Sequence, residues 1–505
     1  MSDWIQLRRG RPRGEDLILE EFQTAYQIFD TSASVPPLVL AIGNEEKRQF
    51  LKQACNAPIK PTGGITLRQL PWAILADCDL HNHSELLPLE PNPLAQRIRH
   101  PIHYVPQYIR QSLPQLPYYI YWQLLAPLSC VIILFARDFS DPDTLVGILS
   151  TWIRSSMTQT MEAPPRIVIV CDEVKSAQAT LNLRLKTAVR EALRSLQPSR
   201  TDHSSSLNSY CRKAFESIQL MPELDNRALG LHIHDLFSLR GIQDLNFSAL
   251  HLKSLLGQAV QELNRSSESL FNVYDASRVR NPVPRDLAHH IVHCFEASKN
   301  SNLDAVSLVA SALEFNAYPP GMHYFQPRRV FDRFYRAAIC HAAQLLSFGD
   351  LPGQVHMRFI EIALQRKGAS SARAHLRLLK HQDEWEHCHS EKTCLVCMAQ
   401  RPSFVLSCMH RLCKPCATIC ARWSPRPGIL SRCPLCGIRN ERRIRLIPPT
   451  AGLRMLEISG NAQSKFTMMK FLTDLEHHIG MKGYALGQHF DLLAGSDIGT
   501  YLAHV

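Results

Sequence analysis

Eight cysteine and histidine residues between positions 394 and 436 restrict what this part of the chain can fold into. They form three C-x2-C pairs and one C-x-H pair. Ten residues separate the first pair from the second, and sixteen separate the third from the fourth. Each pair can hold one edge of a tetrahedral zinc site, because thiolate sulfur and imidazole nitrogen are preferred zinc ligands. In chain order the residues are Cys394, Cys397, Cys408, His410, Cys413, Cys416, Cys433 and Cys436.

The alternatives for such a segment are a set of buried thiols or, in a secreted protein, disulfides. Four regularly spaced ligand pairs favour two zinc ions instead. Four protein ligands would close the coordination sphere of each ion, so the role of the zinc would be structural. A segment of about 43 residues buries too little apolar surface to fold alone. We therefore expect the metal to supply the folding free energy, about 10 kcal/mol or more per site.

The spacing resembles that of RING fingers. In that family the two sites are interleaved along the chain, whereas spacing alone leaves a sequential pairing open. The resemblance implies a first site of Cys394, Cys397, Cys413 and Cys416 and a second site of Cys408, His410, Cys433 and Cys436.

RING fingers recruit ubiquitin-conjugating enzymes, so the resemblance implies a protein partner of this kind. Val396, Pro434 and Leu435 match the apolar positions that contact the conjugating enzyme. Cys420 is an imperfect match to the apolar position in the central helix, and Gly437 replaces the arginine of many active ligases. A purely structural or scaffolding finger is therefore the alternative to a ubiquitin ligase.

Length and composition indicate an intracellular protein of several domains. A chain of 505 residues exceeds a single core, and about three or four domains are expected. The net charge of +11 is spread along the chain, which indicates a solvated surface and no nucleic-acid partner. The start of the chain has no apolar signal segment, so the sixteen cysteines are expected to stay reduced in the cytoplasm or nucleus.

Residues 116–136 are uncharged and long enough to span a bilayer, but they contain Pro117, Gln123 and Pro127. This pattern favours a helix followed by a buried strand, so no stable membrane span is expected.

The N-terminal part predicts a leader at 1–34, with a short helix, followed by an α/β domain at 35–200. Continuous apolar runs at Leu38–Ile42, Cys130–Phe135 and Arg166–Glu173 are typical of parallel strands buried on both faces. The first strand runs into Gly43, where a nucleotide-binding domain carries G-x4-GK[ST]. This loop lacks a second glycine and contains two carboxylates, so we expect a degenerate NTPase-like domain that binds no nucleotide.

After a polar linker the periodicity becomes helical, which predicts a helical region at 210–386. Its histidines lack the carboxylate or cysteine that would complete a metal site. We expect the histidines of the helical region to be ordinary surface or core residues: His289, His290 and His293. We expect the residues just ahead of the finger to form a loop: His387, Cys388 and His389.

Residues 448–505 begin with PPTAG and resemble the opening of a patatin-like phospholipase domain, as in a fungal multidomain arrangement that follows a RING-like finger. Such hydrolases use a glycine-rich oxyanion loop and a G-x-S-x-G elbow that carries the serine nucleophile. Here Ser459–Lys465 keeps one glycine, Asp497 replaces the serine, and the sequence ends at Val505 before a partner aspartate. We expect a truncated segment without hydrolase activity.

The predicted fold class is multidomain α+β, with a degenerate NTPase-like α/β domain, a helical region, a two-zinc cross-brace RING finger at 394–437 and a partial patatin-like α/β segment. The predicted function is zinc binding in a protein-interaction module, which as a RING-type finger would be a candidate ubiquitin ligase. The alternative is a patatin-like lipid acyl hydrolase family member that has lost its catalytic residues.

Overall fold

The computed structural model describes most of the chain and divides it into two units, Met1–Val292 with Asp304–His375 and His293–Leu303 with Leu376–Val505. The described residues are 3–9, 17–30, 35–55, 59, 64–80, 97–102, 116–156, 161–172, 174, 179–181, 183–188, 207–222, 226–265, 270–319, 321–366, 371–380, 385–421, 430–442, 444, 446, 455–460, 465–479, 490 and 492–497.

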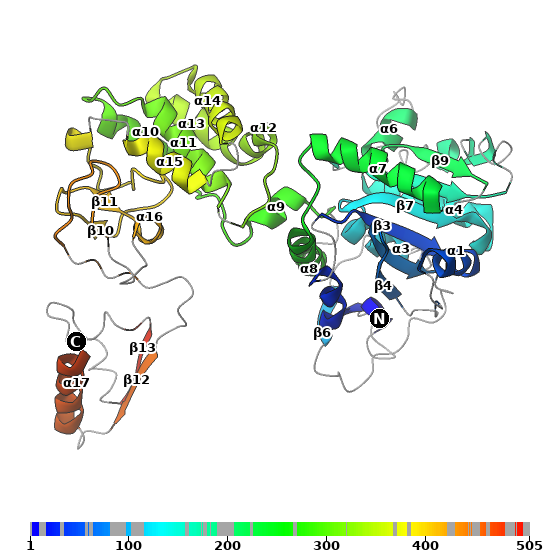
Figure 1. The fold of residues 1–505 in the computed structure, drawn as a ribbon, viewed down its shortest axis with the longest axis horizontal. Helices are drawn as coiled ribbons and strands as arrows, with labels where there is room; N and C mark the ends of the chain where they lie inside the picture. The colour runs from blue at the N-terminus through cyan, green and yellow to red at the C-terminus, as the bar shows by residue number, and fades with distance from the viewer. Residues whose placement is uncertain are drawn as a thin grey trace, which may run out of the picture. The chain divides into compact units, whose positions relative to one another are not determined.

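The first unit contains a nine-stranded mixed sheet of strand order β6-β2-β1-β4-β5-β3-β7-β8-β9 (Figure 1). Strands β5, β3, β7, β8 and β9 run parallel, and the pairings among β4, β1, β2 and β6 and between β4 and β5 are antiparallel. The strands are β1 Asp3–Arg9, β2 Leu17–Phe22, β3 Leu38–Gly43, β4 Gly64–Gln69, β5 Ile74–Asp79, β6 Arg97–Ile102, β7 Ser129–Phe135, β8 Arg166–Val170 and β9 Ile218–Met221.

The three apolar runs predicted as buried parallel strands are confirmed as β3, β7 and β8. Every residue of these strands is buried, because helices cover the sheet. One core cluster joins Val39 and Ile133 of the sheet to Phe50 of α1 (Glu45–Cys55) and to Leu229 and Ile233 of α7 (Asn226–Ile242). Packing around the central strands thus holds the C-terminal end of β3, which is where a nucleotide-binding domain would carry its phosphate-binding loop.

The expectation of a leader at 1–34 is wrong for the described residues of that segment. Strands β1 and β2 pair with each other, and β1 also pairs with β4. Their charged side chains concealed this, because they are buried in ion pairs: Arg8 Nε lies 3.3 Å from Glu20 Oε2, and Arg99 Nε lies 3.1 Å from Glu20 Oε1. The expected short helix is present as a 3₁₀ helix, η1, at Gln23–Asp30.

Residues 116–136 form a helix followed by a strand, as predicted. Helix α3 (Leu116–Leu125) leads into the buried strand β7, and Trp122 stacks on Trp152 of α4 (Pro142–Ser155) with ring centroids 4.8 Å apart. No helix among the described residues combines the length and the apolar character that crossing a membrane requires.

The predicted helical region is confirmed in its main feature, although its first part contributes β9 to the sheet. In α8 the face from Leu252 to Leu263 is buried, as its periodicity indicated. Further helices are α6 Leu207–Ala214, α8 Ala249–Arg265, α9 Val273–Arg278, α10 Leu287–Ser298, α11 Ala305–Ala317, α12 Pro327–Val330, α13 Arg336–Leu346, α14 Leu351–Gln365 and α15 Ser371–Lys380, with a π-helical turn, η4, at Phe331–Tyr335.

The second unit contains the cysteine-rich segment and a β-α-β element (Figure 1). In that element β12 (Met455–Gly460) and β13 (Leu492–Asp497) pair in parallel, with α17 (Lys465–Ile479) between them in the chain. Apolar side chains of α17 face solvent in this structure: Phe466 is 83% exposed and Phe471 is 62% exposed. Two strands are too narrow a surface to cover a helix of this length.

Candidate functional site

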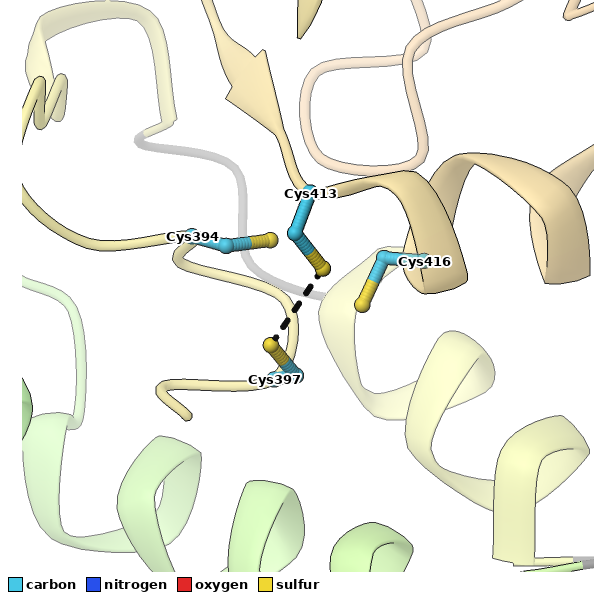
Figure 2. A group of neighbouring side chains, drawn as sticks. All are labelled: Cys394, Cys397, Cys413 and Cys416. Carbon is cyan, nitrogen blue, oxygen red and sulfur yellow. Dashed lines mark hydrogen bonds between the residues drawn. The ribbon is translucent and has the colours of Figure 1, made fainter. Parts of the chain in front are cut away.

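The structure brings the eight predicted ligand residues together in two groups of four. Within each group the candidate ligand atoms all lie within 4.8 Å of one another. The grouping is interleaved, because the first and third pairs of the chain meet, as do the second and fourth. The first group is Cys394, Cys397, Cys413 and Cys416 (Figure 2), and the second is Cys408, His410, Cys433 and Cys436.

Two matching turns present the sulfur atoms of the outer C-x2-C pairs. The backbone N–H of Met398 donates to the carbonyl of Cys394 at 2.8 Å, and that of Gly437 donates to the carbonyl of Cys433 at 3.1 Å. Met398 and Gly437 both have positive φ, 49° and 72°, which closes each turn around its pair. An arginine at position 437 would therefore have to adopt the left-handed conformation that glycine accepts more readily.

The first group has the dimensions of a tetrahedral thiolate site. Zn–S bonds of about 2.3 Å at tetrahedral angles place two sulfur atoms about 3.8 Å apart. The Sγ atoms of Cys397 and Cys413 lie 3.7 Å apart and form no disulfide. Hydrogen bonds from the thiols of the other three cysteines hold the pKa of Cys394 well below its ordinary value, so this cluster favours a thiolate.

The second group is ordered around His410. Its Nδ1 atom lies 3.3 Å from Cys408 Sγ, and its Nε2 atom lies 2.9 Å from the carbonyl oxygen of Trp385. A carbonyl oxygen only accepts, so Nε2 carries the proton and Nδ1 keeps the lone pair that a metal needs. Burial also lowers the pKa of His410, which favours the neutral ligand form.

Short elements of the finger position these ligands. Strands β10 (Phe404–Val405) and β11 (Arg411–Leu412) pair antiparallel around the turn that carries Cys408 and His410. Helix α16 (Lys414–Cys420) begins directly after Cys413 and carries Cys416 in its first turn. Both groups are thus built from turns and helix ends, where backbone donors accompany the sulfur ligands.

Sequence reasoning did not identify Trp385, and it treated the residues that follow as a loop. Trp385–His387 form the 3₁₀ turn η5, Cys388 is buried, and the ring of His389 lies 4.6 Å from that of His410. In the part of the chain that the structure describes, none of these residues joins a group of ligands. No spacing rule marks them, because they contact the site through a carbonyl oxygen and through packing.

The three residues predicted to contact a conjugating enzyme are buried. Val396 is 1% exposed and Leu435 is 3% exposed, and Pro434 is also buried. Cys420, the imperfect match in the central helix, is half-buried, and burial raises the pKa of its thiol to about 12. In this structure these positions form part of the finger's interior, whereas Ile419 and Ile438 beside them are 42% and 50% exposed.

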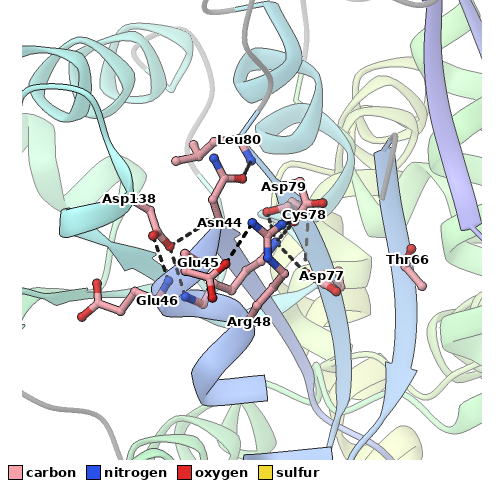
Figure 3. Close-up of polar contacts among 12 residues, drawn as sticks. Asn44, Glu45, Glu46, Arg48, Thr66, Asp77, Cys78, Asp79, Leu80 and Asp138 are labelled. Carbon is pink, nitrogen blue, oxygen red and sulfur yellow. Dashed lines mark hydrogen bonds and ion pairs between the residues drawn. The ribbon is translucent and has the colours of Figure 1, made fainter. Parts of the chain in front are cut away.

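The loop after β3 does not offer a phosphate site, because a carboxylate of the chain occupies the start of α1 (Figure 3). Asp138 accepts hydrogen bonds from the backbone N–H groups of Asn44 at 2.6 Å, Glu46 at 2.9 Å and Lys47 at 3.1 Å. A Cβ atom on Gly43 would lie 2.6 Å from Asp138 Oδ2, so glycine permits this approach. Burial and the nearby Asp138 charge raise the pKa of the Glu46 carboxyl.

Lys47 does not point to a ligand either. Its ammonium is fully buried, 2.6 Å from Asp79 Oδ1 and 2.7 Å from Asp77 Oδ1, and it donates to the Cys78 carbonyl at 2.7 Å. Arg68 pairs with Asp77 at 2.7 Å on the adjacent strand. These contacts tie α1 to β5 and leave the lysine engaged within the protein.

Strands β12 and β13 of the C-terminal element end at the same edge of their strand pair. Gly460, the one glycine of the segment Ser459–Lys465 compared with an oxyanion loop, stands opposite Asp497 in the parallel register. The remainder of both loops, 461–464 and 498–499, lies outside the described residues.

Comparisons with known proteins return no family for this chain. No family model matches it, and no curated protein matches it. The RING-type and patatin-like resemblances therefore rest on their motifs.

Proposed function

We propose that this protein binds two zinc ions in a RING-type finger that acts as a protein-interaction module. The observation that supports the proposal is the interleaved meeting of eight buried or half-buried ligand residues in two groups of four. Cysteine and histidine in sets of four are the donors of structural zinc sites. Cys394, Cys397, Cys413 and Cys416 would hold one ion, and Cys408, His410, Cys433 and Cys436 the other.

Four protein ligands close the coordination sphere, so the zinc ions would hold the loops of the finger in place and take no part in a reaction. The finger has short strands and one short helix, and its function would be to present a surface of fixed shape. An intracellular location suits this role, because the thiolate ligands must remain reduced.

Ubiquitin ligation is the finer form of the same proposal. RING-type spacing favours it, whereas the burial of Val396 and Leu435 and the presence of Gly437 favour a scaffold. We propose the scaffold as the function of the finger in the described arrangement. A ligase would require the groups that cover Val396, Pro434 and Leu435 to move away.

Two measurements on the full chain test these proposals. Mass spectrometry under native conditions should find two zinc ions per chain, and one ion or none would overturn the metal assignment. Autoubiquitination with a panel of purified conjugating enzymes should stay at the level of a variant that lacks the second site, Cys433→Ser. Transfer that is well above this level and needs intact zinc sites would establish the ligase instead.

For the C-terminal element we propose no acyl hydrolysis. Asp497 stands where the related hydrolases have their serine, and residues of a catalytic unit act together, so a lone Asp497→Ser change should not restore turnover. Ester hydrolysis by the purified chain that Ser496→Ala abolishes would contradict this.

A further inference from the structure

A tryptophan outside the cysteine-rich motif accepts a hydrogen bond from the ring nitrogen of His410 that faces away from the other ligands. The carbonyl oxygen of Trp385 accepts from His410 Nε2 at 2.9 Å and also from the backbone N–H of Cys388 at 3.0 Å. Two donors engage both lone pairs of this carbonyl. The oxygen is therefore held in place, and the imidazole that donates to it is held with it.

The indole of Trp385 anchors the same residue to a helix that precedes the finger. Its Nε1 atom donates to the carbonyl of Leu379 in α15 at 2.9 Å, and both residues are almost fully buried. The edge of the indole also meets the His410 ring, with centroids 6.5 Å apart and planes at 86°. A chain of contacts thus runs from α15 through Trp385 to His410.

We propose that Trp385 is the positioning residue of the second zinc site and that it couples metal binding there to the docking of α15. Its carbonyl fixes the tautomer and the ring orientation of His410, so that Nδ1 points at the metal. Its indole fixes the carbonyl. Partners of this kind on ligating histidines alter metal affinity by about 10- to 100-fold. This inference rests on the proposed zinc function of the finger.

The first zinc site gives an internal reference, because its four ligands are all cysteines and the described hydrogen bonds and ring contacts of Trp385 involve none of them. Cobalt(II) in place of zinc separates the two sites, since four thiolates and three thiolates with one imidazole give different visible absorption. Titration of the full chain with cobalt, followed by competition with a chelator, therefore reports the affinity of each site.

Trp385→Ala should lower the affinity of the second site about 10- to 100-fold and leave the first site unchanged. Trp385→Phe keeps a ring but loses the bond to Leu379, so it should lower the affinity of the second site by a smaller factor. The matched control is Trp152→Phe, which removes the same kind of bond from a buried indole to a backbone carbonyl, that of Tyr118 at 3.0 Å. It should change neither site.

Each outcome decides the matter. Selective weakening of the second site in both Trp385 variants supports the proposal. Unchanged affinities in Trp385→Phe and Trp385→Ala, or equal losses at both sites in Trp385→Phe, would overturn it. A wild-type chain that binds no metal would instead overturn the proposed function, so the two failures are distinguishable.

Discussion

The Sγ atoms of Cys397 and Cys413 lie 3.7 Å apart although sixteen positions separate the two residues in the chain. This contact joins the first ligand pair of the chain to the third and passes over the second, the C-x-H pair, so the arrangement is interleaved and not sequential. Cys408 and His410 of the second group lie in the segment between Cys397 and Cys413, so the chain path links the two sites.

Loss of one ligand residue should therefore destabilise the finger by more than the loss of a single metal–ligand bond would. We expect Cys413→Ser to release the first metal and Cys433→Ser the second, because an incomplete ligand set forfeits most of the metal's folding free energy, about 10 kcal/mol or more. Metal content by mass spectrometry and far-ultraviolet circular dichroism check this. Cys340→Ser, a half-buried cysteine of α13, should keep both metals. Two retained ions in either ligand variant would contradict the site assignment.

The buried apolar residues of the finger should behave as core residues. Leu435→Ala should lower the free energy of unfolding of the finger by about 2–4 kcal/mol, because it removes a buried side chain and leaves a cavity. Ile438→Ala, at an exposed neighbour, should cost about 0.5 kcal/mol or less. Urea denaturation followed by zinc release measures both. Equal small costs would show that Leu435 is accessible, as a conjugating-enzyme contact would have to be.

The carboxylate at the start of α1 should exclude nucleotides. ATP with magnesium, or inorganic phosphate, should leave the melting temperature unchanged, because the N–H groups that would bind phosphate already bind Asp138. Asp138→Ala should lower the free energy of unfolding by about 1–3 kcal/mol, since it leaves partly buried donors without their acceptor. A rise in the melting temperature of the wild-type chain on addition of nucleotide would contradict the prediction that this site excludes nucleotides.

The Lys47 ion pairs should be costly to break. Lys47→Met should lower the free energy of unfolding by about 3–5 kcal/mol, because Asp77 and Asp79 would remain buried with one cation fewer. Lys52→Met, on an exposed position of the same helix, should change it by about 0.5 kcal/mol or less. Chemical denaturation of the two variants side by side measures the difference, and similar values would show that the buried pairs are not coupled to folding.

Glu314 should make the first unit less stable as pH rises. Burial raises the pKa of its carboxyl to about 7, in spite of Arg366 Nη1 at 3.0 Å. A raised folded-state pKa means that the folded chain holds the proton more tightly, so the stabilisation is complete below about pH 4.5 and is lost as pH rises to about 7. Glu314→Gln should flatten this slope between pH 5 and 8, as measured by urea denaturation. An unchanged slope would assign the pH dependence elsewhere.

Sequence patterns sufficed for those parts of the molecule in which one side-chain property repeats. The apolar runs of β3, β7 and β8 can be recognised from a few consecutive residues. The ligand pairs of the finger can be recognised in the same way. Strands β1 and β2 could not be found in this way, because Arg8 and Glu20 are buried as partners and look like surface charges in the sequence.

The features that the sequence did not predict depend on contacts between residues far apart in the chain. Asp138 meets Asn44 across 94 positions, and Trp385 meets His410 across 25. Neither contact follows a spacing rule, because the first depends on the adjacency of β3 and β7 and the second on a backbone carbonyl.

Asp138 has one further consequence for the N-terminal domain. An external anion at a helix start stabilises a fold by an amount that grows with the logarithm of its concentration, whereas a carboxylate of the chain itself, here just after β7, is always present. The hydrogen bonds that Asp138 accepts at the start of α1 therefore do not depend on the concentration of any anion around the protein.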